Sequence, residues 1–514
     1  MSTGGGDRKR GIAYQFTQNG LIIGAACIDK IISCNLDVDE IIGRSRENNI
    51  WLVTSEFIDE YVLDSKEEKL CVVSPEPETL SEAGPKAGES VVEVVRSRKP
   101  SASDIEAELV IHDKSDVTGK STCEGKVEDF IDYFNTRYSN VKGVLQNRVE
   151  YRSVLSIDDL KSGNVDGRCR IICMVNNKRE SDKGYRFLDV EDPTGELTVF
   201  ISNENDQLAR AFNRILPDEV VGVEGVLRNE LFIASDITQP DIPFNRQPNY
   251  SEEDVYALFM SDIHVGSYLF LEREFESFIK WLHGHGDKRD VSEKVKYIFV
   301  AGDLVDGIGI YPHQEKELTI PDIYKQYDFL SLLLENIPDY IEVVLSMGNH
   351  DAVRLAEPQP RLPEDIGAPL YELPNVHVVG NPVKVTAHGV DVLMYHGTSL
   401  DTIISNVPEC SYNRPEYAMI EYLRRRHLVP MYGGDSILPE ERDYLFIKDV
   451  PDVFHCGHVH TNGFANYRGV NVINSGTWQG KTKYQEQLGH QPTPARVPAM
   501  NLRNHDVSML YFGD

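Results

Sequence analysis

The stretch Leu258-Phe259-Met260-Ser261-Asp262-Ile263-His264 decides the fold of the C-terminal half of this chain. Its apolar residues predict a buried β-strand, and an aspartate and a histidine follow two positions apart where the strand ends. In open α/β sheets, ligands bind in the crevice beyond the carboxyl ends of the strands. Taken alone, such a triplet is more often an ordinary turn whose histidine is hydrogen-bonded than half of a metal site.

Four further apolar runs end in the same way. Residues 297–301 lead into Gly302-Asp303, 341–345 into Gly348-Asn349-His350-Asp351, 390–395 into His396-Gly397, and 453–456 into Gly457-His458-Val459-His460. The glycines beside most of these residues allow tight turns and close approach of the backbone. Chance can supply one or two such endings, but the whole series predicts one shared site.

The side chains at these strand ends offer oxygen and imidazole donors and no thiolate. They are Asp262, His264, Asp303, Asn349, His396, His458 and His460. This set suits Mn²⁺, Fe or Zn²⁺ better than Ca²⁺ or a soft metal. We therefore predict a site for two divalent metal ions, with Mn²⁺ as the first choice and Fe, Zn²⁺ or Mg²⁺ as alternatives.

Asp303 is the expected bridge, since two cations roughly 3.5–4 Å apart need a shared anion between them. The expected ligands of one cation are Asp262, His264, Asp303 and His460, and those of the other are Asp303, Asn349, His396 and His458. Cations in such a pair activate a water molecule and bind the oxygens of a phosphoryl group. The pattern thus predicts hydrolysis of a phosphate ester.

His350 is not needed as a ligand, yet it is tethered beside Asn349. It is the candidate for protonating the leaving oxygen or stabilising the transition state. Asp306 is a candidate for orienting His350, and a turn cap is an equal alternative. Three further features are expected near the site as candidate contacts for substrate phosphate: the loop 307–311, His313 and Arg354.

The order DxH, GD, GNHD, H and GHxH resembles that of the calcineurin-like metallophosphoesterases. Longer stretches are similar to the small, exonuclease subunit of the archaeal family D DNA polymerase: AGDLVDGIGIYPHQEKEL from residue 301, GNHDAVRLAEPQP from 348, GHVHTNG from 457 and NSGTW from 474. The resemblance extends from about Tyr151 to the C-terminus, and more loosely over the N-terminal region. All the ligand positions and the histidine match.

The resemblance implies a two-sheet phosphoesterase domain that removes nucleotides from DNA in the 3′→5′ direction. It also implies a large catalytic polymerase subunit as partner, in a heterodimer or heterotetramer, and single-stranded or frayed 3′ ends of DNA as substrate. Two other functions stay open: a phosphatase or phosphodiesterase acting on a small substrate, and a non-catalytic assembly subunit. The complete ligand set argues against the assembly subunit, and the additional domains argue against a small substrate.

Length and composition set outer bounds. With 514 residues, 41% of them hydrophobic, the chain is expected to hold two to four domains. It contains no run of 18 apolar residues and no signal pattern at its start, so we expect a cytoplasmic protein without a membrane span. The eight cysteines include no CxxC pair and are expected to be reduced thiols.

The net charge of −30 is unusual for a protein that acts on DNA. A protein that neutralised DNA phosphates over its whole surface would be basic. Two compatible interpretations stay open. The acidic residues form an ordinary solvated surface, or DNA reaches the site through a local basic path or a partner that supplies positive charge. The basic run 424–427 could contact DNA, but a solvated surface is the favoured interpretation.

The predicted fold class is α/β (α+β) and multidomain. We expect a helical N-terminal module over 1–73, a flexible linker over 74–125, a helical connector over 126–148, an OB-fold β-barrel over 149–245, and the two-sheet metallophosphoesterase domain over 250–514. The linker is rich in Pro, Ser, Gly and Glu. The barrel is inferred from three strands, a helix and two strands. Tyr185 and Phe187 could stack bases there, but we favour rings that fill the barrel.

Overall fold

The computed structural model describes residues 99–163, 167–487 and 489–513. It also describes parts of the N-terminal region: residues 8, 11–12, 15–16, 19, 21–34, 36–47, 52–53 and 57–58. Within these ranges, no helix has both the length and the apolar character needed to cross a membrane.

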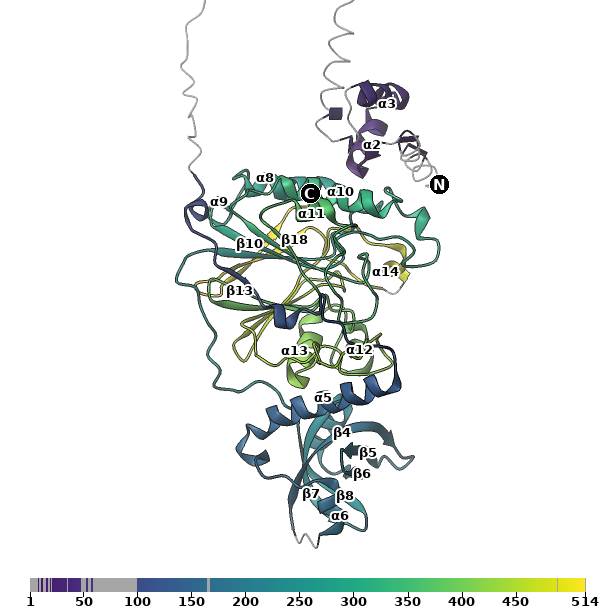
Figure 1. The fold of residues 1–514 in the computed structure, drawn as a ribbon, viewed down its shortest axis with the longest axis vertical. Helices are drawn as coiled ribbons and strands as arrows, with labels where there is room; N and C mark the ends of the chain where they lie inside the picture. Colours follow the sequence, from purple (N-terminus) through teal and green to yellow (C-terminus); the bar gives the residue numbers. More distant parts are fainter. Residues whose placement is uncertain are drawn as a thin grey trace, which may run out of the picture.

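Two six-stranded sheets form the centre of the C-terminal half (Figure 1). The first has the order β12-β11-β10-β9-β18-β19 and consists of β9 (Tyr256–Met260), β10 (Val295–Ala301), β11 (Glu342–Ser346), β12 (Val376–Val378), β18 (Arg496–Asn501) and β19 (Val507–Tyr511). The second has the order β16-β17-β15-β14-β13-β3 and consists of β3 (Leu109–Ile111), β13 (Val383–Ala387), β14 (Val390–Met394), β15 (Val453–Cys456), β16 (Gly463–Tyr467) and β17 (Val470–Asn474).

Alternate side chains of the strands point to opposite faces of the first sheet, and each face packs into a different core. Phe259 of β9 stacks on Phe299 of β10 at 5.6 Å, and both belong to a core that the two sheets share. Leu258 and Met260 point the other way, into the core beneath the helices of the first sheet. Those helices are α8 (Glu272–Leu282), α9 (Arg289–Ser292), α10 (Ile323–Glu335) and α11 (Ala368–Tyr371), while α12 (Leu400–Asn406) and α13 (Pro415–Arg425) cover the second sheet (Figure 1). Helices α8 and α10 form the crossovers between the parallel strands β9, β10 and β11.

The direction of the strands gathers their ends. Strands β9, β10 and β11 run parallel to one another, as do β14, β15 and β17. Their carboxyl ends therefore lie at the same edge of each sheet, which is where the sequence places the candidate ligands. The short helix α14 (Lys483–Gln487) and the 3₁₀ turn η4 (Gln314–Lys316) complete this part of the chain.

The flexible linker expected over 74–125 is wrong for residues 99–125, and 74–98 lie outside the described residues. Ile111 of β3 pairs with Val385 of β13, and the 3₁₀ turns η1 (Ser101–Asp104) and η2 (Asp113–Ser115) flank this strand. Ala102 and Val117 are buried. A three-residue strand at a sheet edge needs few apolar residues, because its neighbour supplies the hydrogen bonds, so average composition did not reveal it.

Residues 169–238 form a closed barrel with the order β4-β5-β6-β8-β7. Its elements are β4 (Cys169–Glu180), β5 (Arg186–Asp192), β6 (Gly195–Ile201), α7 (Asp206–Arg214), β7 (Val220–Arg228) and β8 (Leu231–Thr238), preceded by η3 (Val149–Tyr151) and α6 (Ile157–Ser162). Leu188 and Val190 point into the barrel core. Phe187 precedes Leu188, so its side chain points away from the barrel core and is partly exposed. The Arg179 guanidinium carbon lies 4.6 Å from the centroid of the Phe187 ring. Tyr185 is exposed. The expectation that these rings fill the barrel is wrong.

Helix α5 (Val127–Gln146) lies between the barrel and the sheets (Figure 1). Its Tyr138 hydroxyl donates to the Ile172 carbonyl of the barrel at 3.0 Å. On the other side, the buried guanidinium of Arg137 donates to the carbonyls of Val429 and Pro430 at 3.1 and 3.0 Å. The helix thus joins both bodies with polar as well as apolar contacts.

The described part of the N-terminal region holds the helices α2 (Ala25–Ser33) and α3 (Val38–Glu47). Two short parallel strands, β1 (Ile22–Ile23) and β2 (Leu52–Val53), accompany them. Ile28, Ile31 and Ile41 belong to a core of their own. The helical spacing predicted for this region is present, and the strand pair was not foreseen.

The basic run 424–427 is not a solvated surface, contrary to expectation. The side chain of Arg425 is 1% exposed, its Nε lies 2.6 Å from Glu219 Oε2 and its Nη1 lies 2.5 Å from Glu421 Oε2. Glu219 precedes β7 of the barrel, whereas Arg425 ends α13. This buried ion pair therefore connects the barrel to the second sheet's helices.

We expect Arg425→Met to lower the free energy of unfolding by about 3–5 kcal/mol, because Glu219 would remain buried without its cation. Urea unfolding followed by circular dichroism measures the change. Arg168→Met is the control, since Arg168 pairs with Glu224 at 3.3 Å but its side chain is 67% exposed. That variant should lose less than about 1 kcal/mol. Equal unfolding midpoints for the two variants would contradict the structural role of Arg425.

Candidate metal centre

The candidate ligands expected for the first cation lie at the ends of β9, β10 and β15. His264 Nε2 and His460 Nε2 are 3.1 Å apart, and His460 Nε2 is 3.4 Å from Asp262 Oδ1. Asp303 Oδ2 lies 3.8 Å from His264 Nε2. These side chains are buried, and their donor atoms converge on one point.

The donors expected for the second cation lie on the other side of Asp303. The same Oδ2 atom of Asp303 is 3.4 Å from His396 Nε2, which is 3.0 Å from Asn349 Oδ1. The rings of His396 and His458 have centroids 5.2 Å apart. Asp303 Oδ2 thus faces imidazoles of both halves, which is the geometry required of a bridging carboxylate.

The donor chemistry fits a pair of divalent cations. Asp262 and Asp303 are 0% and 2% exposed, and buried charges of one sign need a counter-ion. Burial acts to raise the pKa of Asp303, yet the imidazoles of His396 and His350 hold this pKa well below its ordinary value. Burial acts to lower the pKa of His396, but Asp303 and Asp262 raise it to about 10. The site strongly favours positive charge between its carboxylates.

Two histidines are oriented through their second nitrogen. His264 Nδ1 is 3.1 Å from Asp306 Oδ1, and His396 Nδ1 is 2.8 Å from the Ala301 carbonyl oxygen. Such contacts fix the ring so that Nε2 points at the metal. Asp306 is therefore a supporting residue. The sequence suggested that it orients His350, but its carboxylate orients His264. Gln314 and Gln479 each donate to that carboxylate at 3.0 Å, and neither was foreseen.

His458 and His460 are held from a different side. His458 Nε2 is 3.2 Å from Asp401 Oδ2 of α12, which leaves Nδ1 as the nitrogen available to a metal. His460 Nδ1 is 2.9 Å from Gln485 Nε2 of α14. No local pattern marks Asp401 or Gln485, because they lie far along the chain from the histidines they contact.

The backbone at the strand ends is strained. Asp262, His264, Asp303, His458 and His460 have φ of 52°, 53°, 50°, 68° and 56°. Non-glycine residues rarely adopt this left-handed region, and such strain concentrates at functional sites. At Gly348, a Cβ atom would lie 2.2 Å from Asp303 Oδ1, so only glycine lets the third strand end approach the central carboxylate.

His350 sits beside the ligands without being held as one. Its backbone N–H donates to Asp303 Oδ1 at 2.8 Å, and its Nδ1 donates to the Asp306 carbonyl oxygen at 2.8 Å. Its ring meets the His264 ring edge-on at 4.7 Å. Burial lowers the pKa of His350. Because Nδ1 is occupied, Nε2 is the atom that can exchange a proton with a substrate.

The two expected phosphate contacts outside the loop 307–311, Arg354 and His313, have protein partners in the structure. Arg354 Nε donates to the Pro358 carbonyl oxygen at 2.8 Å, and Arg354 Nη2 lies 2.9 Å from Glu440 Oε1. Its guanidinium is thus committed to protein oxygens. His313 has a side chain that is 78% exposed and lies 3.8 Å from Glu315. Within the loop itself, Tyr311 places its ring centroid 6.4 Å from that of His350.

We expect Asp303→Asn to weaken the binding of both metal ions, because the bridging charge is lost, whereas His264→Ala should weaken mainly one. The measurement is the number of Mn²⁺ ions retained per chain after gel filtration. Asp182→Asn on the exposed surface of the barrel is the control and should retain the full complement. Two tightly held Mn²⁺ ions in Asp303→Asn would rule out the bridging role.

Comparison with known proteins is consistent with this geometry. Residues 256–513 match the calcineurin-like phosphoesterase family. The DNA polymerase II small subunit of Archaeoglobus fulgidus is 39% identical over 510 residues, 98% of each chain. The proteins of the same name from Pyrococcus abyssi and Halobacterium salinarum are 40% and 37% identical over 74% and 77% of this chain, and 62% and 77% of their own lengths. The chain therefore belongs to the family of small subunits of the archaeal family D DNA polymerase and carries its calcineurin-like phosphoesterase domain.

Proposed function

We propose that this chain is a metal-dependent exonuclease that hydrolyses DNA phosphodiester bonds in the 3′→5′ direction and proofreads for a replicative family D DNA polymerase. The observation that carries the proposal is the convergence of a complete donor set on Asp303, with His350 beside it. A subunit kept only for assembly would not need buried carboxylates facing imidazole nitrogens, an arrangement that costs stability without a cation.

Each half of the site would hold one ion. Asp262, His264 and His460 would bind the first, Asn349, His396 and His458 the second, and Asp303 both. When bound, the two cations, with Mn²⁺ as the first choice, supply Lewis acidity that activates water and stabilises charge on the phosphoryl oxygens. The protein's own part is to fix these donors, which the contacts of Asp306, Ala301, Asp401 and Gln485 accomplish.

His350 is the proposed proton donor. The Asp306 carbonyl holds Nδ1, and the Asp303 carboxylate holds the backbone N–H of the same residue. In the doubly protonated imidazolium, Nε2 can then deliver its proton to the oxygen that leaves phosphorus, while Nδ1 keeps the proton that it donates to the Asp306 carbonyl. The leaving oxygen is the 3′ oxygen of the penultimate nucleotide when a 3′-terminal nucleotide is removed. A positioned acid of this kind contributes roughly 10²–10⁴ in rate.

The domain division supports a place in a larger complex. We assign the N-terminal module to 1–73, the connector to 126–148, an OB-type barrel to 149–245 and the phosphoesterase domain to 250–514, which β3 completes from outside. The strand order of the closed barrel supports the OB assignment. We propose a large catalytic polymerase subunit as partner, because the net charge of −30 leaves this chain poorly equipped to hold DNA alone.

The decisive experiment supplies a 5′-labelled single strand and, separately, a phosphate monoester, each with and without Mn²⁺. We expect Mn²⁺-dependent shortening of the strand one nucleotide at a time from its 3′ end, and little monoester hydrolysis. His350→Ala should keep its metals and fold but lose on the order of 10²–10⁴ in rate, since it removes the proton donor.

His313→Ala is the matched control, because that exposed histidine is not joined to the metal centre and should cleave at the parental rate. Preferential monoester hydrolysis would favour a small-substrate phosphatase. No hydrolysis by a metal-loaded chain would favour the assembly subunit. Parental cleavage by His350→Ala would leave that residue a packing role only.

Docking to the large subunit is expected through the phosphoesterase and barrel domains, because a frayed primer end must be delivered to a rigidly held site. Removing residues 1–73 should therefore leave co-purification with the large subunit intact. Crosslinks should map to residues beyond 99. A complex that is lost on this truncation would place the docking surface in the N-terminal module.

A further inference from the structure

Two tyrosines with accessible rings lie on segments that contact different residues of the metal centre. Tyr311 lies beside His350, and Tyr484 is the neighbour of Gln485, which contacts His460. Tyr311 is 37% exposed and follows the end of β10, and Tyr484 is 70% exposed and lies on α14. Large exposed aromatic rings beside a phosphodiester site are candidate stacking surfaces, because every nucleobase offers a π-face. Neither ring is needed to hold the metal ligands.

Tyr311 is fixed next to the proton donor. Its hydroxyl donates to Glu317 Oε2 at 3.1 Å, and its ring centroid lies 6.4 Å from that of His350 at an angle of 60°. The hydroxyl contact anchors the far end of the side chain, so the orientation of the ring is set before a substrate arrives. A preorganised ring binds a base at a lower entropic cost.

Tyr484 is fixed through its neighbours. The adjacent Gln485 contacts His460 Nδ1 at 2.9 Å, and its carbonyl accepts the backbone N–H of His490 at 2.8 Å. The His490 ring lies against Tyr412, with centroids 4.0 Å apart and an interplanar angle of 31°.

Tyr412 lies beside Asp401, and the Asp401 carboxylate is 3.2 Å from His458 Nε2. Gln485 and His490 are thus linked to the two histidines of the GHxH motif, and these contacts hold the part of α14 that carries Tyr484.

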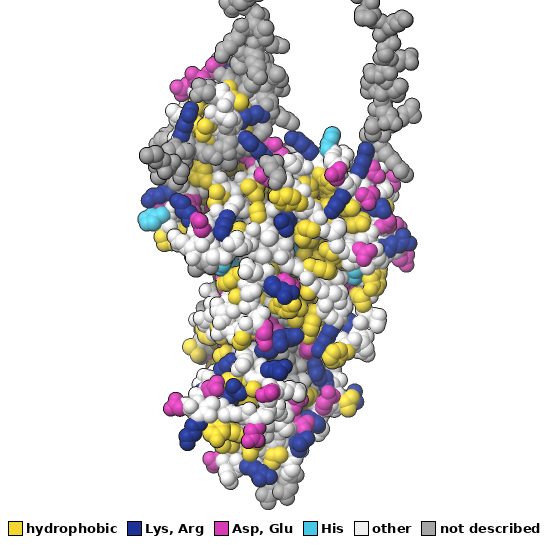
Figure 2. Space-filling model, turned by 180° about the vertical axis from the view of Figure 1, so that it is seen from behind, with side chains coloured by type: hydrophobic (Ala, Val, Ile, Leu, Met, Phe, Trp, Pro, Cys, Tyr) yellow, Lys and Arg dark blue, Asp and Glu magenta, His cyan; other side chains and the backbone are white. Residues whose placement is uncertain are grey.

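The charges of the chain provide little attraction for the phosphates of a DNA single strand. The chain carries a net charge of −30, and Figure 2 shows Lys and Arg side chains interspersed with Asp and Glu on the face it displays. Arg425 and Arg426 are buried, and Arg354 is paired with Glu440. A strand that is weakly held by its phosphates must be held by its bases, which favours stacking as the main contact.

We propose that Tyr484 stacks on the 3′-terminal base and Tyr311 on the penultimate base, so that the scissile phosphate lies between them over Asp303. This proposal rests on the proposed exonuclease function. The assignment of sides follows from His350: it protonates the 3′ oxygen of the penultimate nucleotide, and Tyr311 is the ring beside it. Both bases must be unpaired to stack, so the device selects single-stranded or frayed ends.

The test uses single strands with 2-aminopurine at the terminal or the penultimate position, because stacking quenches its fluorescence. Binding is measured in the His350→Ala background, which keeps the strand intact. We expect Tyr484→Leu to abolish quenching at the terminal position only, and Tyr311→Leu at the penultimate position only. Each variant should bind the strand roughly 5- to 150-fold more weakly, the usual range for loss of one stacked base.

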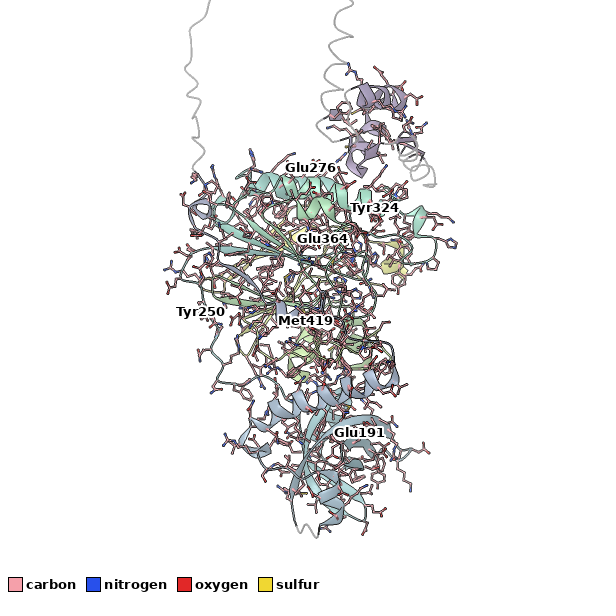
Figure 3. The ribbon with its side chains drawn as sticks, viewed as in Figure 1. Glu191, Tyr250, Glu276, Tyr324, Glu364 and Met419 are labelled. Carbon is pink, nitrogen blue, oxygen red and sulfur yellow. The ribbon has the colours of Figure 1, made fainter. Side chains whose placement is uncertain are left out.

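In the His350-containing chain, the same substitutions should raise KM for the strand. Tyr484→Phe retains the ring and should bind like the parent. Tyr311→Phe also retains the ring but loses the Glu317 anchor, so it should bind more tightly than Tyr311→Leu and more weakly than the parent. Tyr250→Leu is the matched control, since Tyr250 is 53% exposed but lies on the opposite flank from α14 (Figures 1 and 3). On a strand whose terminal nucleotide is abasic, Tyr484→Leu and the parent should bind with equal affinity, because there is no terminal base to stack.

Parental binding and quenching in both leucine variants would overturn the proposal, and so would quenching lost at the opposite position. Loss of large-subunit binding with unchanged strand binding would reassign these rings to a protein contact. Failure of the proposed function gives a different result: the parent would hydrolyse bis(p-nitrophenyl) phosphate and leave the strand whole, while the quenching experiment would still decide where the bases stack.

Discussion

The contact on which the structure depends is that of Asp303 Oδ2 with His264 Nε2 and His396 Nε2, at 3.8 and 3.4 Å. The two imidazoles come from different sheets, and the carboxylate lies between them. For this contact to form, the ends of β10 and β14 must meet. The backbone at Gly348 must also approach the Asp303 carboxylate so closely that a Cβ atom would not fit between them. Glycine at 348 and the left-handed backbone at Asp303 are consequences of that requirement.

Much of the candidate site was predictable because its ligands follow a local rule. An apolar run followed by a donor is visible in the sequence, and parallel strands bring such endings together. The residues that orient the ligands follow no such rule. Asp401 reaches His458 and Gln485 reaches His460 only because helices far along the chain pack beside the site. Arg354 has the charge expected of a phosphate contact, but its guanidinium forms an ion pair with Glu440.

The fold shows the same division. The order of strands and helix along the barrel segment was predictable from periodicity, because periodicity reports burial of one face. Strand β3 and the buried Arg425 were not. A short edge strand is too small to alter the composition of a long polar segment, and an arginine is buried only when partners such as Glu219 and Glu421 are present. Both cases depend on a residue that lies far away in sequence, Val385 for β3 and Glu219 for Arg425.

The position of β3 has a consequence for how the chain can be divided. Ile111 pairs with Val385, so the barrel is enclosed in sequence by two parts of one sheet. Both ends of the barrel segment are therefore tied to the same body, and it cannot swing away on a single hinge. A fragment that begins after residue 111 would leave β13 as an uncovered edge with free N–H and C=O groups, ready to pair with another chain. Self-association of such a fragment would result from the removal of β3 and would not indicate that the full chain self-associates.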